Sequence, residues 1–142
     1  MPSLINTFKS FFGLSMQLSR LEKTIFDAVG QKLQEKEAQL WNGQLAAINK
    51  IHRSPDGKEV NVWAMRGGKP DFPKVLCFGK SEEFKLAVVD VTASAGALTL
   101  RGRVWCVEGH VFSIEYKNSF KEFEKSAQGD WQVHCHIENY PA

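Results

Sequence analysis

The hydrophobic period changes near residue 40, and this change constrains the fold more than any other feature of the chain. Up to that point apolar residues recur three or four positions apart, as on one face of a helix. Beyond it they mostly alternate with polar residues, as in strands with one covered face. The pattern predicts a single α+β domain over residues 1–142, with a helical layer packed on a mostly antiparallel, twisted β-sheet.

The helical part divides at Gly13. A short amphipathic segment precedes it, over residues 4–12, and a long N-terminal helix is expected from Leu14 to about Trp41, where Asn42-Gly43 provides a stop signal. Charged residues fall between the apolar positions of this long helix, which are Leu14, Leu18, Leu21, Ile25, Ala28 or Val29, Leu33 and Leu40.

Several strands are expected after residue 44. Ser54-Pro-Asp-Gly57 is a tight-turn sequence, so residues 45–53 and 58–66 should form a hairpin around it. A short strand over 75–78 and a longer one over 84–91 follow. The continuous apolar run 86–89 predicts an interior strand that is covered on both faces.

A second hairpin is expected where Glu108-Gly109 joins strands 98–107 and 110–116. A plain two-residue turn sets its register, with Val107 opposite His110, Trp105 opposite Phe112 and Arg103 opposite Ile114.

The end of the chain combines a short helix with a last strand. Ser119 and Glu122 match a capping box, so a short helix should begin there, before the last strand at 130–138. That strand alternates, with Trp131, Val133, Cys135 and Ile137 expected to face inward and Gln132, His134, His136 and Glu138 outward.

Composition excludes several broad classes of protein. Among 142 residues, 43% are hydrophobic and 24% are charged, which is ordinary for a folded domain and unlike a disordered chain. The net charge is only +2 and the charges are interspersed, so we expect no nucleic-acid partner. No apolar run approaches the 18 or so residues that a membrane-spanning helix needs.

Three isolated cysteines bear on the compartment. Cys77, Cys106 and Cys135 are far apart and lie among apolar residues, which is typical of buried free thiols in a reducing environment. The first residues also lack the pattern of a signal peptide. We therefore expect a cytoplasmic protein.

Common catalytic signatures are missing from the sequence. It contains no Gly-x-x-x-x-Gly-Lys-Ser/Thr phosphate loop, no Gly-x-Ser-x-Gly elbow and no His-Glu-x-x-His pair. The sequence therefore predicts a protein that is not an enzyme and that needs no cofactor.

The nearest approach to a metal site is His134-x-His136, with Glu138 on the same face of the last strand. His110 and Cys106 are candidate third ligands, but they fall on opposite faces of their own hairpin. A complete ligand set cannot be assembled from these positions, so a solvated polar strand face is the preferred interpretation and no metal is expected.

Arg101, Arg103 and Trp105 alternate along one strand and so share one of its faces. Arginine forms bidentate hydrogen bonds and tryptophan buries a large area, which makes this combination typical of protein interfaces. The predicted partner-binding residues are these three together with His134, His136 and Glu138 of the last strand.

The run Arg101-Gly-Arg-Val-Trp-Cys-Val-Glu-Gly-His-Val-Phe-Ser-Ile-Glu-Tyr116, in a helix-then-meander chain, resembles small bacterial immunity proteins of polymorphic-toxin and contact-dependent growth inhibition systems. The resemblance implies a non-enzymatic protein that binds one cognate toxin domain and blocks its active site or its substrate path. Immunity proteins against nucleases are often acidic, and the net charge of +2 departs from that pattern.

An alternative interpretation rests on the architecture alone. A helical layer across a curved sheet also occurs in cystatin-like and NTF2-like folds, where a pocket between helix and sheet can bind a small molecule. In such an enzyme, His110 or the pair His134 and His136 would act as acid and base with Glu115 or Glu138.

Overall fold

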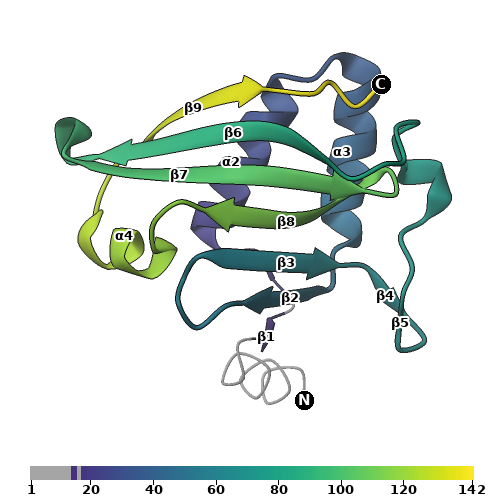
Figure 1. Ribbon diagram of the computed structural model, residues 1–142, viewed down its shortest axis with the longest axis horizontal. Helices are drawn as coiled ribbons and strands as arrows, with labels where there is room; N and C mark the ends of the chain where they lie inside the picture. Colours follow the sequence, from purple (N-terminus) through teal and green to yellow (C-terminus); the bar gives the residue numbers. More distant parts are fainter. Residues whose placement is uncertain (1–13, 16) are drawn as a thin grey trace.

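A computed structural model of the protein describes residues 14, 15 and 17–142 (Figure 1). The expected amphipathic segment over residues 4–12 lies outside the described residues. No helix in the described part has both the length and the apolar character that crossing a membrane requires. The elements, in chain order, are β1 (Leu14–Ser15), α2 (Arg20–Gln31), α3 (Glu35–Ala47), β2 (Lys50–Arg53), β3 (Glu59–Trp63), β4 (Met65–Arg66), β5 (Lys69–Pro70), the 3-10 turn η1 (Lys74–Leu76), β6 (Phe84–Ala93), the 3-10 turn η2 (Ser94–Gly96), β7 (Leu98–Val107), β8 (His110–Tyr116), α4 (Phe120–Ser126) and β9 (Gln132–Ile137).

The main sheet is antiparallel throughout, with the strand order β1-β2-β3-β8-β7-β6-β9. Helices α2 and α3 lie behind it in the view of Figure 1, which looks onto the opposite face of the strands. The α+β class, the mostly antiparallel sheet and the short helix before the last strand are thus confirmed. A separate small ribbon is formed by β4 and β5.

The long helix expected over residues 14–41 is wrong, because the described part of this span contains two helices and β1. Gln34 has an extended backbone and starts α3 after a break at the end of α2. The break lets the two helices contact each other, and the Trp41 Nε1–H donates to the Phe26 carbonyl at 2.9 Å. A Cβ at Gly30 would lie 3.1 Å from the Trp41 ring, so a side chain there would crowd this contact.

The core lies between these helices and the sheet. Phe26 and Trp41 are fully buried and pack edge to face, with ring centroids 5.7 Å apart. Phe78 stacks on Trp41 with ring centroids 6.4 Å apart. From the sheet, Val89, Leu100 and Ile114 point into the same cluster with no exposed surface. Large apolar side chains therefore fill the space beneath the helices.

The main sheet contains two β-bulges, and the first of them changes the register predicted for the second hairpin. Val107 does pair with His110, but a bulge between Trp105 and Cys106 shifts the rest of the hairpin by one residue. Trp105 consequently lies opposite Ser113, and Arg103 lies opposite Glu115, so the two pairings expected with Phe112 and Ile114 are wrong.

The second bulge, between Lys85 and Ala87 of β6, explains the apolar run of that strand. Leu86 and Ala87 are adjacent and both are fully buried. The strand is interior in the sheet, as expected, but helices cover only one of its faces. Asp90 and Thr92 point to the other face, so the prediction that both faces are covered is wrong.

Smaller differences occur at element ends. The strand expected over 75–78 is replaced by the 3-10 turn η1, and residues 45–47 belong to α3 rather than to the first strand. The turn at 54–57 and the inward position of Cys135 in β9 are confirmed. Ser119 caps α4, as expected, by accepting bonds from the Lys121 and Glu122 amides.

Gln44 of α3 is the polar connection between the helical layer and one end of the sheet. Its amide donates to the Leu76 and Gly109 carbonyls at 2.8 and 3.0 Å, and its oxygen accepts from the Val111 amide at 3.0 Å. The residue has no exposed surface. The Gly109 carbonyl also accepts from the Phe78 amide at 2.8 Å, so the fully buried Val111 amide is the group that depends most on Gln44.

We predict that Gln44→Ala lowers the free energy of unfolding by about 3 kcal/mol, because it opens a cavity and removes the hydrogen bond of the buried Val111 amide. Urea denaturation monitored by tryptophan fluorescence measures this loss. Gln39→Ala, at an exposed position of the same helix, is the matched control and should change stability by under about 0.5 kcal/mol. Equal stability of the two variants would contradict the role assigned to Gln44.

Candidate functional site

The face of the sheet opposite α2 and α3, called here the open face, carries the candidate site. In a strand alternate residues share a face, and in a sheet paired residues continue it across strands. The register therefore places side chains of the open face in rows. One row is His136–Val88–Arg103–Glu115–Glu59, the next is His134–Asp90–Arg101, and a third is Lys85–Trp105–Ser113–Asn61–His52.

All the residues predicted from the sequence to bind a partner lie on this face or at its border. Arg101, Arg103 and Trp105 come from β7, and His134 and His136 from β9, two strands away. Glu138 follows the end of β9 and forms an ion pair with Lys85 at 3.1 Å. The sheet thus brings together residues that are more than thirty positions apart in the chain.

Arg101 holds Asp90 in a two-pronged ion pair. Its Nε and Nη2 donate to the two carboxylate oxygens at 2.8 and 3.0 Å. The hydrogen bonds from Arg101 hold the pKa of Asp90 below its usual range, so this carboxylate stays ionised at neutral pH. His134 is the cross-strand neighbour of Asp90 on the other side.

Arg103 makes a longer contact, at 3.6 Å, with Glu115. Glu115 in turn lies directly opposite Glu59 on β3, and both carboxylates are exposed. Like charges at opposite positions repel, and one arginine at this distance compensates them only partly. The bulge in the hairpin creates this arrangement, because without it Glu115 would not face Arg103.

Trp105 is half-buried on the open face, where it lies beside Ser113 and Lys85. Ser113 is almost fully covered although no helix lies over it. Half-buried aromatic and polar residues therefore lie beside the charged rows of the face, and both kinds of residue occur in protein interfaces.

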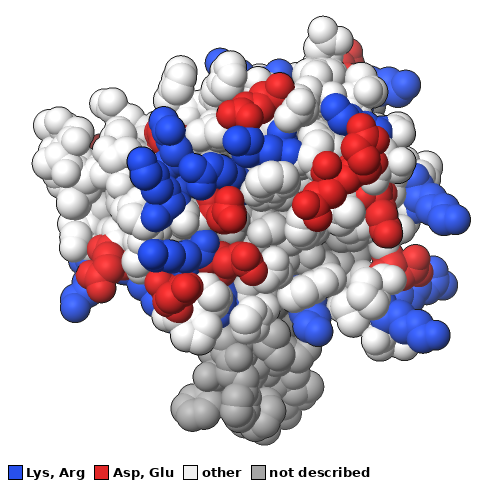
Figure 2. Space-filling view, viewed as in Figure 1, with Lys and Arg blue, Asp and Glu red and all other residues white. Residues whose placement is uncertain are grey.

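The charges of the open face are mixed. Figure 2 shows Lys and Arg gathered over β7 and the neighbouring strands, with Asp and Glu side chains among them. Arg101, Arg103 and Lys117 are matched by Asp90, Glu59 and Glu115. A surface of this kind suits a partner with complementary charges of both signs better than a polyanion.

The histidines of the open face do not assemble a metal centre. His134 and His136 lie opposite Asp90 and Val88, respectively. Across the described part of the chain, no three His, Cys, Asp or Glu side chains come together in a way that could hold a metal ion.

Three of the acid and base residues considered for an enzyme contact groups other than one another. His110 stacks on Phe72 at 4.0 Å, whereas Glu115 and Glu138 pair with Arg103 and Lys85. Burial raises the pKa of the Cys135 thiol to about 11, and it raises that of Cys106 still further. Both thiols are therefore un-ionised at neutral pH and are poor nucleophiles.

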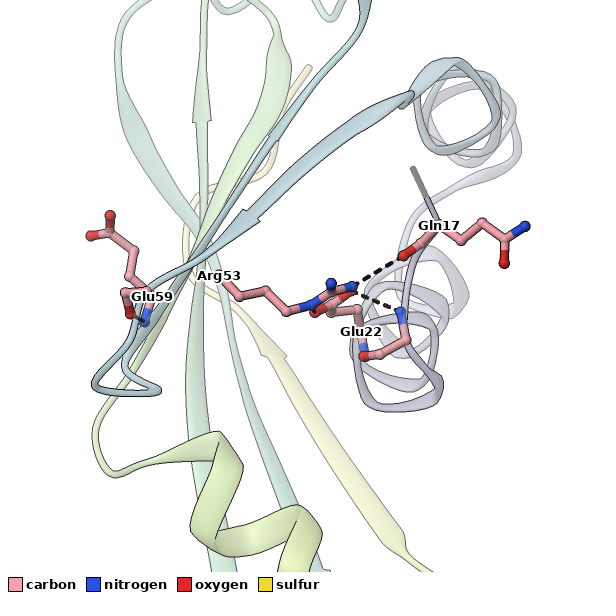
Figure 3. A network of polar contacts seen from close by, with 6 residues as sticks. Gln17, Glu22, Arg53 and Glu59 are labelled. Atoms are coloured by element: carbon pink, nitrogen blue, oxygen red, sulfur yellow. Dashed lines mark hydrogen bonds and ion pairs between the residues drawn. The ribbon is translucent and has the colours of Figure 1, made fainter. Parts of the chain in front are cut away.

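A buried polar cluster on the other face was not anticipated from the sequence. Figure 3 shows Arg53 of β2 reaching toward α2, while Glu59 points away on the open face. The Arg53 Nε and Nη2 donate to Glu22 at 2.7 and 2.8 Å, and Nη2 also reaches the Gln17 carbonyl. Glu22 accepts from the Ser19 amide as part of a capping box. The Ser19-x-x-Glu22 spacing is the signal that could have located this helix start.

Glu124 of α4 and the Tyr116 hydroxyl complete this cluster. The hydroxyl is buried and has no hydrogen-bond partner among the described residues. Burial, and then the negative charge of Glu22, raise the pKa of Glu124 above its usual value. The cluster fixes the start of α2 against β2 and closes the core at this end.

Comparison with known proteins found no family model that matches the chain, and no similar curated protein or solved structure.

We predict that Glu124→Gln stabilises the protein at pH 7. A carboxyl group whose pKa is raised by folding binds its proton more tightly in the folded state, so its ionised form opposes folding. This cost is fully present above the folded pKa and disappears as the pH falls below the unfolded value of about 4.3. Chemical denaturation at several pH values should show the advantage of the variant shrinking toward pH 4. Glu122→Gln, exposed on the same helix, is the control, and an advantage that does not vary with pH would contradict the assignment.

Proposed function

We propose that the protein is a non-enzymatic binding protein that holds one protein partner against the open face of its sheet. The observation that carries this proposal is that Arg101, Arg103, Trp105, His134, His136 and Glu138 share that face. Their chemistry, with a half-buried tryptophan among arginines and carboxylates, matches the composition of protein interfaces.

The kind of partner follows from the resemblance of residues 101–116 to immunity proteins. We propose a bacterial, cytoplasmic immunity protein that neutralises a cognate toxin domain by covering its active site. The balanced charge of the open face supports a folded protein domain as the partner rather than nucleic acid. An interface of standard size, about 1,600 Å² in total, would extend over most of the rows described above.

The core beneath the helices supports binding at the surface rather than within the fold. Phe26, Trp41 and Leu100 have no exposed surface and pack together in one cluster. The described depressions that border the sheet are shallow and open, and they lie on the open face. A large partner can contact such depressions without entering the protein.

Affinity capture from the native host at near-physiological salt tests the proposal, with His134→Ala/His136→Ala as the informative variant. Both side chains are exposed, so the substitution should leave the fold intact. We expect one stoichiometric protein partner with the wild type, and at least about tenfold less captured partner with the variant, because both histidine side chains would lie in the interface.

The control for this experiment is Lys23→Ala/Lys36→Ala, which removes two exposed side chains from α2 and α3. It should capture as much partner as the wild type. A partner that is lost with the helix variant and kept with the sheet variant would contradict the proposal, and so would the absence of any stoichiometric partner. Growth protection of cells that express the captured partner would identify that partner as a toxin that the protein neutralises.

A further inference from the structure

The small ribbon formed by β4 and β5 places two cations side by side. The chain turns at Gly67 and Gly68, whose φ angles are +59° and +79°, so the connection is a tight turn that favours glycine at both positions. Arg66 and Lys69 flank this turn and lie directly opposite each other. Opposite residues of an antiparallel pair share a face, with Cβ atoms about 5 Å apart, so the two positive charges repel each other.

Backbone contacts fix the ribbon to the end of the main sheet. The Asn49 side chain acts as a neighbouring strand would: its oxygen accepts from the Met65 amide at 2.7 Å, and its amide donates to the Met65 carbonyl at 2.9 Å. The Asp71 amide donates to the Ala64 carbonyl at 2.7 Å and closes the other end of the ribbon. Ala64 and Phe72, which flank the ribbon in the chain, are buried. The two cations are therefore presented on an ordered backbone.

Positive charge exceeds negative charge at this end of the sheet. The Lys50 ammonium group lies over the Trp63 ring, 5.0 Å from its centroid. Arg66 and Lys69 add two more cations, and Asp71, directly after the ribbon, adds one carboxylate. Within the residues that the structure describes, no ion pair joins any of these four charged groups to another group. Figure 2 shows Lys and Arg side chains projecting at the lower right of the molecule, where Figure 1 draws the ribbon.

The ribbon adjoins the open face. Lys50 and Trp63 are paired, two positions along from His52 and Asn61, which belong to one of the rows of that face. Because alternate residues of a strand share a face, Lys50 and Trp63 also belong to the open face. A partner that covers the open face at this end therefore meets the cations of the ribbon at its border.

The rest of the open face limits the kind of anion that can bind here. Its arginines are accompanied by the carboxylates of Asp90, Glu59 and Glu115, so a nucleic-acid strand that continued from the ribbon across the face would meet negative charge. The tip of the ribbon consists of two exposed glycines, and it has no apolar side chain that could enter a membrane. A short acidic stretch of a protein suits both observations.

We infer that Arg66 and Lys69 bind two neighbouring carboxylates on the surface of the protein partner. This inference rests on the proposed function and names the partner chemistry at the border of the open face. Carboxylates one turn apart on a helix, for example, have Cβ atoms about 5–6 Å apart, which is close to the spacing of the two cations. Binding of such a pair also offsets the repulsion between the cations, which the free protein does not relieve by an ion pair.

Amide chemical shifts of the isotope-labelled protein test the inference without knowledge of the partner. The probe is the capped peptide acetyl-Gly-Glu-Glu-Gly-amide at millimolar concentrations and low ionic strength, compared with its Gln-Gln counterpart. We expect the Glu peptide to shift the signals of the two turn glycines, and the Gln peptide to leave them in place. Arg66→Gln/Lys69→Gln should reduce these shifts at least about fivefold. Lys23→Gln/Lys36→Gln, which removes the same charge from the helices, should leave them unchanged.

The same two variants in the capture experiment relate the peptide result to the partner. We expect about fivefold less captured partner with Arg66→Gln/Lys69→Gln than with the wild type, because two ion pairs at the border of the interface are lost. Lys23→Gln/Lys36→Gln should capture as much partner as the wild type does. Equal capture by all three proteins would contradict the inference.

Further outcomes would also overturn the inference. Equal shifts from both peptides would exclude recognition of charge. Binding of a DNA duplex, or of vesicles that contain phosphatidylserine, at physiological salt would assign the ribbon to that surface instead if the ribbon variant abolished it. If the Glu peptide has no effect while partner capture still depends on His134 and His136, the carboxylate assignment fails and the proposed function stands. If the Glu peptide shifts the turn glycines but no partner is captured, the proposed function fails.

Discussion

The packing of two consecutive helices on one face of a single antiparallel sheet determines the rest of this structure. Every second residue of the central strands must be apolar to fill the core, as Val89, Leu100 and Ile114 do. The residues between them are then free to be polar, because no second helical layer covers them. Gln44 and the Arg53–Glu22 ion pair fix the helices at opposite ends of this layer. The core is thereby closed, and the polar side chains of the central strands lie on the open face.

Hydrophobic period was sufficient to predict the α+β class, and turn residues located the hairpin turns. In the last strand the inward position of Cys135 is confirmed, whereas Val133, also expected to face inward, is 37% exposed. Hydrophobic period could not predict the pairing of Arg103 with Glu115, because that pairing depends on a bulge between Trp105 and Cys106. A bulge inserts one residue without a distinct sequence signal, and a shift by one residue moves side chains to the other face. The break between α2 and α3 was missed for a related reason, since apolar spacing continues across it while the backbone turns at Gln34.

The residues of the candidate site could be chosen from the sequence, but their arrangement on one surface could not be predicted. Arg101, Arg103 and Trp105 share a strand face by simple alternation, whereas the adjacency of β6 to both β7 and β9 is a property of the topology. That adjacency brings Asp90 between Arg101 and His134. The result is a face with few apolar groups and interspersed charges. Specificity there would come from charge complementarity more than from buried area, and association should weaken as salt increases.

The central claim is that the open face, and not the helical face, is covered by a partner in the cell. Hydroxyl-radical footprinting of the protein in extract of its native host, compared with the purified protein, measures this most directly. If a partner covers the open face, Trp105, His134 and His136 are labelled much less in the extract than in the purified protein. Val75, which is 82% exposed beside α3, is labelled equally in both samples. Equal labelling of Trp105 and the two histidines in both samples, or protection of Val75 alone, would contradict it.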